Sequence, residues 1–232
     1  MALPQLASAK YELTLPSTGE KVEYRPFLVK EEKILMIAQS TGEQKDILKA
    51  VEQIIDACTF GKLDVKKLPM FDLEYIFIQL RSKSVGSEVE VFVLCPDDKE
   101  TRVPVKINLE DIKCVKEVGH DNNIKLTDSI GIVMDYPRVT TINFFNGNDA
   151  ESAFDIIKDC VRQIYDAENV YEKVDMDDKE LNTFLESMSH EQFEKMQNFF
   201  ESMPKVKHSV KVKNPNTGVE SDVVLEGLNS FF

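Results

Sequence analysis

A pattern of alternating apolar and polar residues, broken by a turn that contains proline, occurs three times along the chain. The first copy covers residues 10–25, the second covers 89–108, and the third covers 208–225. Alternation with a period of two is typical of half-buried strands, and proline and glycine suit the turn between two strands. The sequence therefore predicts three antiparallel β-hairpins.

Helical spacing of apolar residues fills the stretch between the first two hairpins. Residues 30–38 predict a short helix with Glu31 and Glu32 in its first turn. In residues 43–58 the apolar side chains form one stripe opposite a charged face. In residues 68–82 they cover nearly the whole circumference, which is typical of a helix buried in a core.

The middle of the chain has weaker patterns. Residues 113–127 are polar and predict an irregular segment with an exposed tip at 119–123. Asp128 is expected to cap a short helix that runs to Met134. Asp149 is expected to cap a longer helix that ends near residue 166.

Two more helices are expected before the last hairpin. Residues 171–178 predict an acidic connection, and helices follow over 179–188 and 190–203. Ser189 and Gln192 have the spacing of a capping box at the start of the second helix.

These elements predict an α+β fold made of helices and several short antiparallel hairpins. We expect two regions. Residues 1–112 form an N-terminal hairpin, helical and hairpin region, and residues 113–232 form a helical region that ends in a ribbon-like hairpin.

The ribbon-like interpretation comes from two turns. Cys95-Pro-Asp-Asp98 and Asn214-Pro-Asn-Thr-Gly218 both resemble a zinc knuckle, Cys-Pro-x-Cys-Gly, from which ligands have been lost. A structural zinc site needs four Cys or His ligands, and only Cys95 remains of the four expected cysteines. Other candidate ligands, which lack ligand spacing to Cys95, are Cys114, His120 and His208. We therefore predict a degenerate zinc-ribbon-like hairpin without a metal or cofactor.

Composition narrows the class of function. The chain has 232 residues, of which 28 are basic and 41 are acidic, giving a net charge of −13. This sign argues against a general nucleic-acid binder and against an anionic membrane surface, and it fits basic protein partners. The four cysteines have no paired spacing, and no signal peptide is recognised, so reduced thiols in a cytoplasm are expected.

Catalytic motifs are missing from the sequence. It contains no glycine-rich phosphate loop and no nucleophile elbow. Leu15-Pro-Ser-Thr-Gly19 matches a surface-sorting signal by chance and is interpreted as a turn. Cys58 and Cys160 lie on apolar helix faces and are expected to fill the core. Among enzymes, a hydrolase that uses Glu110 and Asp111 remains a remote alternative.

Aromatic and methionine side chains are the candidate partner-binding residues. Phe193, Met196 and Phe200 form an apolar stripe that suits either the core or a partner groove. Phe231 and Phe232 end the chain and must pack against either its own core or a partner.

Three stretches of the chain resemble the baseplate hub assembly proteins of T4-type contractile-tailed phages. They are residues 11–33, residues 58–86 with the phrases CTFGKLDV, FDLEY and QLRSKSVG, and the ending VLEGLNSFF. The resemblance covers nearly the whole chain and is weakest over 138–190. Some relatives keep the knuckle cysteines, and this sequence departs from them there.

The resemblance implies a non-enzymatic protein that helps to assemble the baseplate hub as a chaperone or scaffold. Its partners would be other tail and hub proteins, without nucleic acid or membrane, and its place would be the host cytoplasm during assembly. A permanent component of the virion baseplate is the alternative. The oligomeric state stays open.

Overall fold

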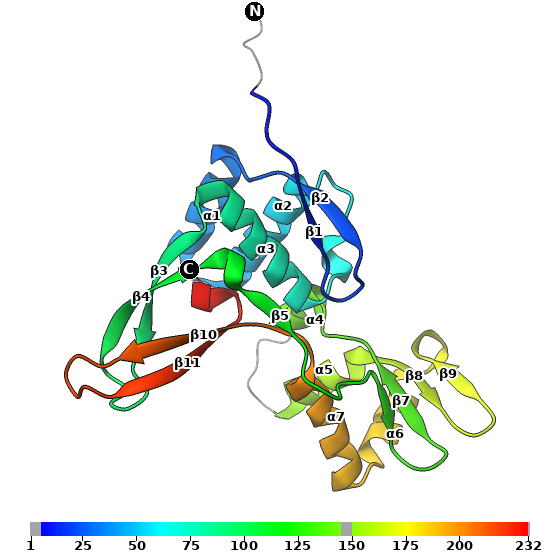
Figure 1. Ribbon diagram of the computed structural model, residues 1–232. Coiled ribbons are helices and arrows are strands. Elements are labelled where there is room, and N and C mark those ends of the chain that lie inside the picture. Colours follow the sequence, from blue (N-terminus) through cyan, green and yellow to red (C-terminus); the bar gives the residue numbers. More distant parts are fainter. Residues whose placement is uncertain (1–5, 145–149, 232) are drawn as a thin grey trace, which may run out of the picture. The chain divides into compact units, whose positions relative to one another are not determined.

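The chain divides into two compact units, and each is described by itself. The computed structural model describes residues 6–144 and 150–231 (Figure 1). Unit 1 comprises Met1–Val115 and Pro204–Phe232, and unit 2 comprises Lys116–Met203. Helices and small antiparallel sheets occur in both units, which confirms the predicted α+β class.

The predicted division of the chain at residue 112 needs correction. The third hairpin lies in unit 1, whereas the sequence placed it at the end of the region 113–232. The physical reason is a strand that the sequence did not reveal. β5 (Lys113–Val115) pairs with the start of β10 (Lys205–Lys213) and so joins the last segment of the chain to unit 1.

All three predicted hairpins are present in unit 1. The antiparallel pairs are β1 (Tyr11–Thr14) with β2 (Lys21–Tyr24), β3 (Glu88–Leu94) with β4 (Arg102–Asn108), and β10 with β11 (Glu220–Glu226). The third hairpin becomes a three-stranded sheet in the order β11-β10-β5.

Along the sequence, the helices of unit 1 lie mainly between the first two hairpins. They are α1 (Val29–Thr41), α2 (Gln44–Cys58) and α3 (Met70–Val85), and the short 3-10 helices are η1 (Val65–Lys67), η2 (Leu109–Asp111) and η4 (Leu228–Phe231).

The three hairpin turns share one backbone geometry. In each turn the N–H of the fifth residue donates to the carbonyl oxygen of the first residue. The pairs are Gly19 to Leu15 at 2.8 Å, Lys99 to Cys95 at 3.0 Å, and Gly218 to Asn214 at 2.8 Å. The fifth residue has a positive φ in all three turns, a conformation that glycine adopts freely and lysine adopts at a cost. The pattern that is repeated in the sequence therefore corresponds to a turn structure that is repeated in the fold.

The second and third turns are bonded to each other. Asn214 is 1% exposed, and its side-chain amide donates to the carboxylates of Asp97, at 3.0 and 3.1 Å, and Asp98, at 2.8 Å. Its side-chain carbonyl oxygen accepts a hydrogen bond from the N–H of Asn216 at 2.9 Å. The Thr217 hydroxyl also donates to Asp97. We call Asp97, Asp98, Asn214 and Thr217 the turn clasp.

The zinc-ribbon-like detail of the predicted fold is not confirmed. The two knuckle-like turns meet through the hydrogen bonds of the turn clasp, and Cys95 is buried beside them as a free thiol. Within residues 6–144 and 150–231, no group of three or more His, Cys, Asp or Glu side chains is placed to hold a metal ion.

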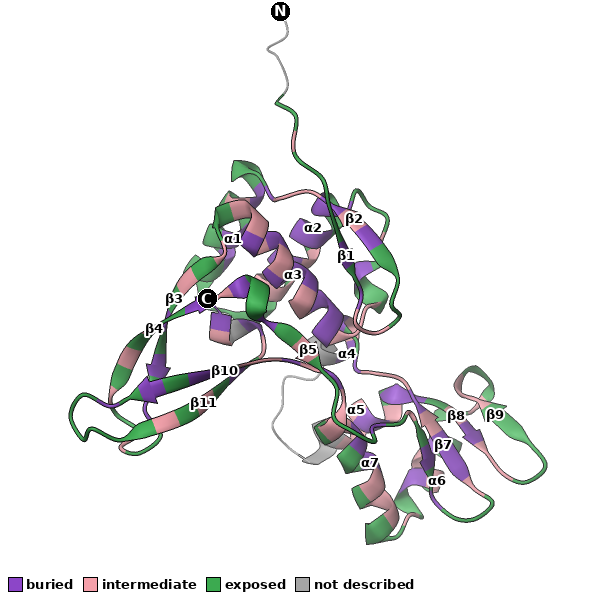
Figure 2. Cartoon of the chain, viewed as in Figure 1, coloured by how far each residue is buried: buried purple, intermediate pink, exposed green. Residues whose placement is uncertain are grey.

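Helix α3 is buried on nearly all sides, as its apolar circumference predicts (Figure 2). Leu73, Ile76 and Leu80 are fully buried, and Phe77 and Ile78 are 1% exposed. Burial of one such side chain contributes about 1.5–3 kcal/mol. The helix is therefore the main apolar element of unit 1.

Polar side chains of α3 bind segments from other parts of unit 1. Asp72 is fully buried and accepts hydrogen bonds from the N–H of Ser17, at 3.0 Å, and from the Ser17 hydroxyl. The Ser84 hydroxyl oxygen accepts a hydrogen bond from the N–H of Phe27 at 2.9 Å. These bonds attach the first hairpin turn and the segment before α1 to the buried helix.

Unit 2 is a four-stranded antiparallel sheet with helices packed on it. The sheet order is β6 (Asn123–Lys125), β7 (Gly131–Met134), β8 (Val161–Tyr165) and β9 (Val170–Glu172). The helical elements are α4 (Val139–Phe144), α5 (Ala150–Cys160), η3 (Lys173–Asp175), α6 (Asp178–Glu186) and α7 (His190–Ser202). Its core joins side chains of β6, β7 and β8 to those of α5, α6 and α7.

Three predictions for the middle of the chain are wrong. The segment 113–127, predicted as irregular, contains β5 and β6. The helix predicted from Asp128 to Met134 is replaced by β7, because Ile132 and Val133 favour a strand that pairs on both sides. The helix predicted to end near residue 166 ends at Cys160, where β8 begins. Its expected cap, Asp149, lies outside the described residues.

We predict that Asn214→Ala lowers the free energy of unfolding by about 1–3 kcal/mol, because it removes a buried amide that links two turns. Urea denaturation measures the change. Asn216→Ala is the matched control and should cost less, because it removes a single exposed hydrogen bond to the Thr101 hydroxyl, at 3.0 Å. Equal losses for both variants would contradict a special role of the turn clasp.

Candidate partner-binding site

Helix α7 uses its apolar stripe for the core of unit 2. Met196 is fully buried, so of the two alternatives for this residue, core or partner groove, the structure shows the core. Phe193 and Phe200 are partly buried and pack against the same core. Phe199, which the sequence analysis did not single out, is 3% exposed and stacks on Tyr136 with ring centroids 5.6 Å apart. The apolar stripe of α7 therefore covers the sheet of unit 2.

Phe231 also packs against its own chain. It is 1% exposed, and its carbonyl oxygen accepts a hydrogen bond from the Arg81 guanidinium of α3. Of the two alternatives for this residue, docking on the core of the chain is therefore the correct one. Phe232 lies outside the described residues.

A second residue of α3 holds the same segment. The Glu74 carboxylate accepts a hydrogen bond from the N–H of Leu228 at 3.3 Å. Burial raises the pKa of Glu74 to about 7, and the nearby charge of Glu226 adds to the shift. The bond to Leu228 acts in the opposite direction. η4 is thus attached to α3 through one carboxyl group and one guanidinium.

Helix α1 exposes apolar side chains that the sequence analysis did not identify. Val29 is 79% exposed, Met36 is 64% exposed and Ile37 is 56% exposed. The run Ile-Leu-Met-Ile-Ala over 34–38 was the available signal, because it contains more apolar residues than one buried stripe needs. Such side chains on one helix are typical of a surface that contacts another protein.

A cavity opens on unit 2 between β8, β9 and α6. Its volume is about 270 Å³, and its lining includes Tyr165, Tyr171, Met176 and Phe184. The sequence analysis assigned residues 171–178 to an acidic connection and did not predict a cavity there. Short strands such as β9 give too weak an alternation to be recognised from sequence.

The cysteine thiols are not activated. Burial raises the pKa of Cys58 to about 11, and the pKa of Cys114 and of Cys160 to about 12. A thiol becomes a nucleophile as its thiolate, so these groups are inert near neutral pH. Cys58 and Cys160 are buried, as their positions on apolar helix faces predict.

His120 and Ser202 lie side by side, but their bonding is structural. His120 is 8% exposed, which corrects its placement in an exposed tip. Its Nδ1 lies 2.9 Å from the Ser202 hydroxyl, and its Nε2 lies 3.1 Å from the Tyr136 hydroxyl. The Ser202 hydroxyl donates its hydrogen to the Asn198 carbonyl, so it accepts from His120 rather than being deprotonated by it. Burial lowers the pKa of His120 and favours the neutral ring.

The two carboxylates of the hydrolase alternative are exposed on η2. Lys83 pairs with Glu110 and lowers the pKa of that carboxyl group. A general acid of a hydrolase needs a raised pKa near neutral pH. Glu110 therefore lacks the feature on which that alternative depends, and Asp111 beside it is also exposed.

A family model described as T4 bacteriophage base plate protein matches residues 8–232. The chain belongs to this family. The match covers nearly the whole chain and confirms the resemblance found in the sequence to T4-type phage baseplate proteins. No curated protein and no solved structure matches the chain.

Membership in the base plate family places the chain among the baseplate proteins of the phage tail. Its neighbours there are other baseplate proteins. Within the described residues, no helix is both long enough and apolar enough to span a bilayer. The features described above that suit contact with another protein are the exposed face of α1 and the cavity of unit 2.

We predict that Phe231→Ala lowers the free energy of unfolding of this baseplate protein by about 3–5 kcal/mol, because it leaves a cavity in unit 1. Denaturant titration followed by circular dichroism measures the loss. Phe92→Ala, at a residue that is 65% exposed on β3, should change stability by less than about 1 kcal/mol. A loss below about 1 kcal/mol at Phe231 would show that the residue is not docked.

Glu74→Gln should change the dependence of stability on pH. Because the pKa of Glu74 is about 7 in the folded state and about 4.3 in an unfolded chain, the folded state holds the proton between these values. The stabilising contribution is present below about pH 4.3 and is lost as the pH rises through 7. The Gln variant keeps an acceptor for Leu228 and does not titrate. Its stability relative to the wild type should therefore rise by about 1–3 kcal/mol between pH 5 and pH 8.

Urea titrations at the two pH values measure this difference. Glu90→Gln, on the exposed side of β3, is the control. A difference that shrinks with rising pH would contradict the raised pKa of Glu74.

Proposed function

We propose that the chain takes part in the assembly of the baseplate hub as a chaperone or scaffold and catalyses no reaction. Its partners are other hub proteins of the same phage, and it works in the host cytoplasm while the baseplate forms. The proposal extends membership in the base plate family, which by itself does not distinguish an assembly factor from a permanent component.

The observation that supports the proposal is the exposed apolar surface of α1. Exposed apolar side chains on α1 are costly in water unless another protein covers them for part of the time. Against an enzyme stand the protonated thiols, the neutral His120 and the ion-paired Glu110. No described cluster joins a nucleophile, a base and an acceptor site in a catalytic geometry.

A permanent component of the virion baseplate remains the second candidate. The family match supports it as well, because proteins that stay in the particle also contact their neighbours through apolar surfaces. The two candidates differ in a single property, which is whether the chain remains in the finished particle.

We predict that the tagged chain co-purifies with hub proteins from infected cells and is absent from finished particles. Mass spectrometry of both samples makes the measurement, with a baseplate protein that stays in the particle as the internal control. A stoichiometric amount of the chain in finished particles would establish the permanent component instead. A chain that binds no tail protein would contradict both candidates.

A further inference from the structure

Unit 2 carries almost all of the net negative charge of the chain. Residues 116–203 contain 19 acidic and 8 basic residues, a net charge of −11. The remaining residues contain 22 acidic and 20 basic residues, a net charge of −2. Acidity that served solubility alone would not need to collect in one unit, so this distribution points to a partner of opposite charge.

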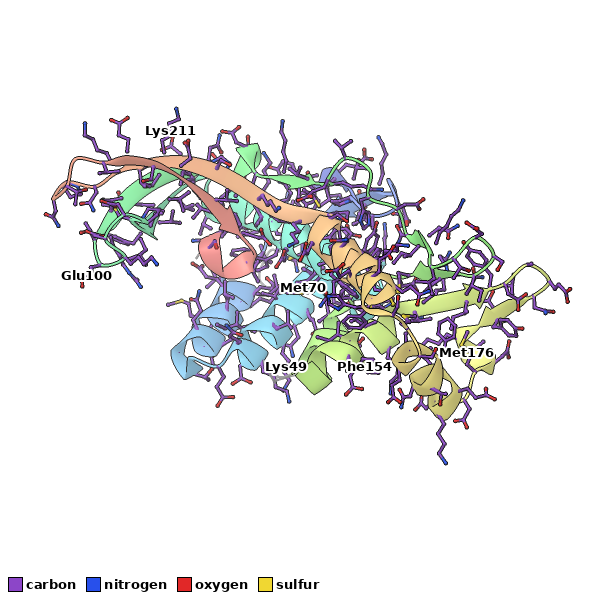
Figure 3. All side chains as sticks on the ribbon, turned by 90° about the horizontal axis from the view of Figure 1, so that it is seen from below. Lys49, Met70, Glu100, Phe154, Met176 and Lys211 are labelled. Atoms are coloured by element: carbon purple, nitrogen blue, oxygen red, sulfur yellow. The ribbon has the colours of Figure 1, made fainter. Side chains whose placement is uncertain are left out.

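The cavity of unit 2 lies within this charge. Tyr165, Tyr171, Met176 and Phe184 supply its apolar lining, and Asp166 and Glu180 add two carboxylates to it. Figure 3 labels Met176, which lies between η3 and α6. We call these six residues the acidic pocket. Its volume of about 270 Å³ falls below the roughly 300–1,000 Å³ of small-molecule sites, and it suits one large side chain better than a cofactor.

The carboxylate of Asp166 is held in its charged form. It accepts hydrogen bonds from the N–H groups of Glu168 and Asn169, both at 2.8 Å, and from the Tyr171 hydroxyl at 3.0 Å. These bonds lower its pKa. The same bonds hold the β8–β9 turn and place the Tyr171 ring at the cavity. The pocket therefore presents a fixed negative charge next to an apolar surface.

More acidic groups lie along the segment 172–180 that lines the pocket, which contains five acidic and two basic residues. Asp175 ends η3, Asp177 is the N-cap residue of α6, and Asp178 is the first residue of α6. Lys173 binds the carbonyl oxygen and the carboxylate of Asp159, where its charge is offset. The surroundings of the pocket thus remain negative.

An exposed strand edge adjoins the pocket. β9 is at the end of the sheet order, and Val170, Tyr171 and the neighbouring Val174 are 63%, 46% and 91% exposed. Apolar side chains on a short edge strand are the features that a partner segment can cover. A second copy of the chain is a poor candidate for this place, because two units of charge −11 would repel each other.

We propose that the acidic pocket binds a segment of another protein in which one large apolar side chain is flanked by lysine or arginine. The apolar side chain enters the cavity between Tyr171, Met176 and Phe184, and the flanking cations face Asp166 and Glu180. This inference rests on the proposed function in that it assigns a partner-binding surface to an assembly protein. The chemistry of the pocket can nevertheless be tested without any other phage protein.

The probe is a synthetic peptide with one phenylalanine between pairs of lysines, blocked at both ends. It is titrated into the full chain labelled at the methionine methyl groups, and the Met176 resonance is followed by NMR. We expect a saturable shift of this resonance that weakens at least threefold when the salt concentration rises from 50 to 300 mM. Replacing the phenylalanine by glycine should weaken binding at least tenfold. Replacing the lysines by glutamates should abolish it.

Variants of the chain localise the site. Met176→Lys places a cation in the cavity and should weaken peptide binding at least tenfold; because this variant has no Met176 resonance, binding to all variants is compared by isothermal titration calorimetry. Val118→Lys adds the same charge to the same unit at a fully exposed residue outside the pocket, and it should leave the affinity within twofold. Tyr171→Ala is a second variant that removes an apolar wall, and it decides the question if Met176→Lys fails to fold.

Several outcomes would overturn the inference. They are equal binding of the lysine and glutamate peptides, no loss on removing the phenylalanine, equal effects of Met176→Lys and Val118→Lys, and a Met176 resonance that never moves. Co-purification separates this inference from the proposed function. If Met176→Lys keeps its hub partners, the pocket is not the assembly contact and the proposed function stands. If the wild-type chain has no hub partners, the proposed function fails.

Discussion

The hydrogen bonds made by polar side chains of one buried helix determine how unit 1 is put together. α3 is apolar around most of its surface and must be covered on all sides. Its few polar groups then decide which segments do the covering. Asp72 binds the first hairpin turn, Ser84 binds the segment before α1, and Glu74 and Arg81 bind the segment at η4. An unpaired polar group in such a place is costly, so each bond selects one arrangement over its alternatives.

The turn clasp applies the same principle at the outer ends of two hairpins. The three turns have one backbone geometry but two kinds of partner. The first turn is bound by α3, whereas the second and third are bound by each other through Asn214. A fold with several small sheets can bury little apolar area at each turn. Hydrogen bonds of amide and carboxyl groups therefore stabilise the turns in place of apolar contacts.

The hairpins and most helices could be predicted because their signals are local. The alternation in 89–108 and the stripe in 43–58 specify β3, β4 and α2 almost to the residue. β5 and β7 could not be predicted, because three or four residues form a strand only where a neighbour pairs with them. The stripe of α7 was recognised, but periodicity does not tell whether a core or a partner covers it. The pocket depends on the meeting of β8, β9 and α6, which pair or pack only in the folded chain.

Unit 1 is made from two separate parts of the chain, with the whole of unit 2 between them. β10 supplies the middle strand of a unit 1 sheet, and Phe231 fills the same unit's core. During synthesis, unit 2 can complete its core while unit 1 still lacks a strand and a core side chain. A chain that ends after residue 203 would therefore contain a folded unit 2 attached to an incompletely folded unit 1. Chaperones and proteases that recognise exposed apolar surface would therefore act on unit 1 rather than on unit 2.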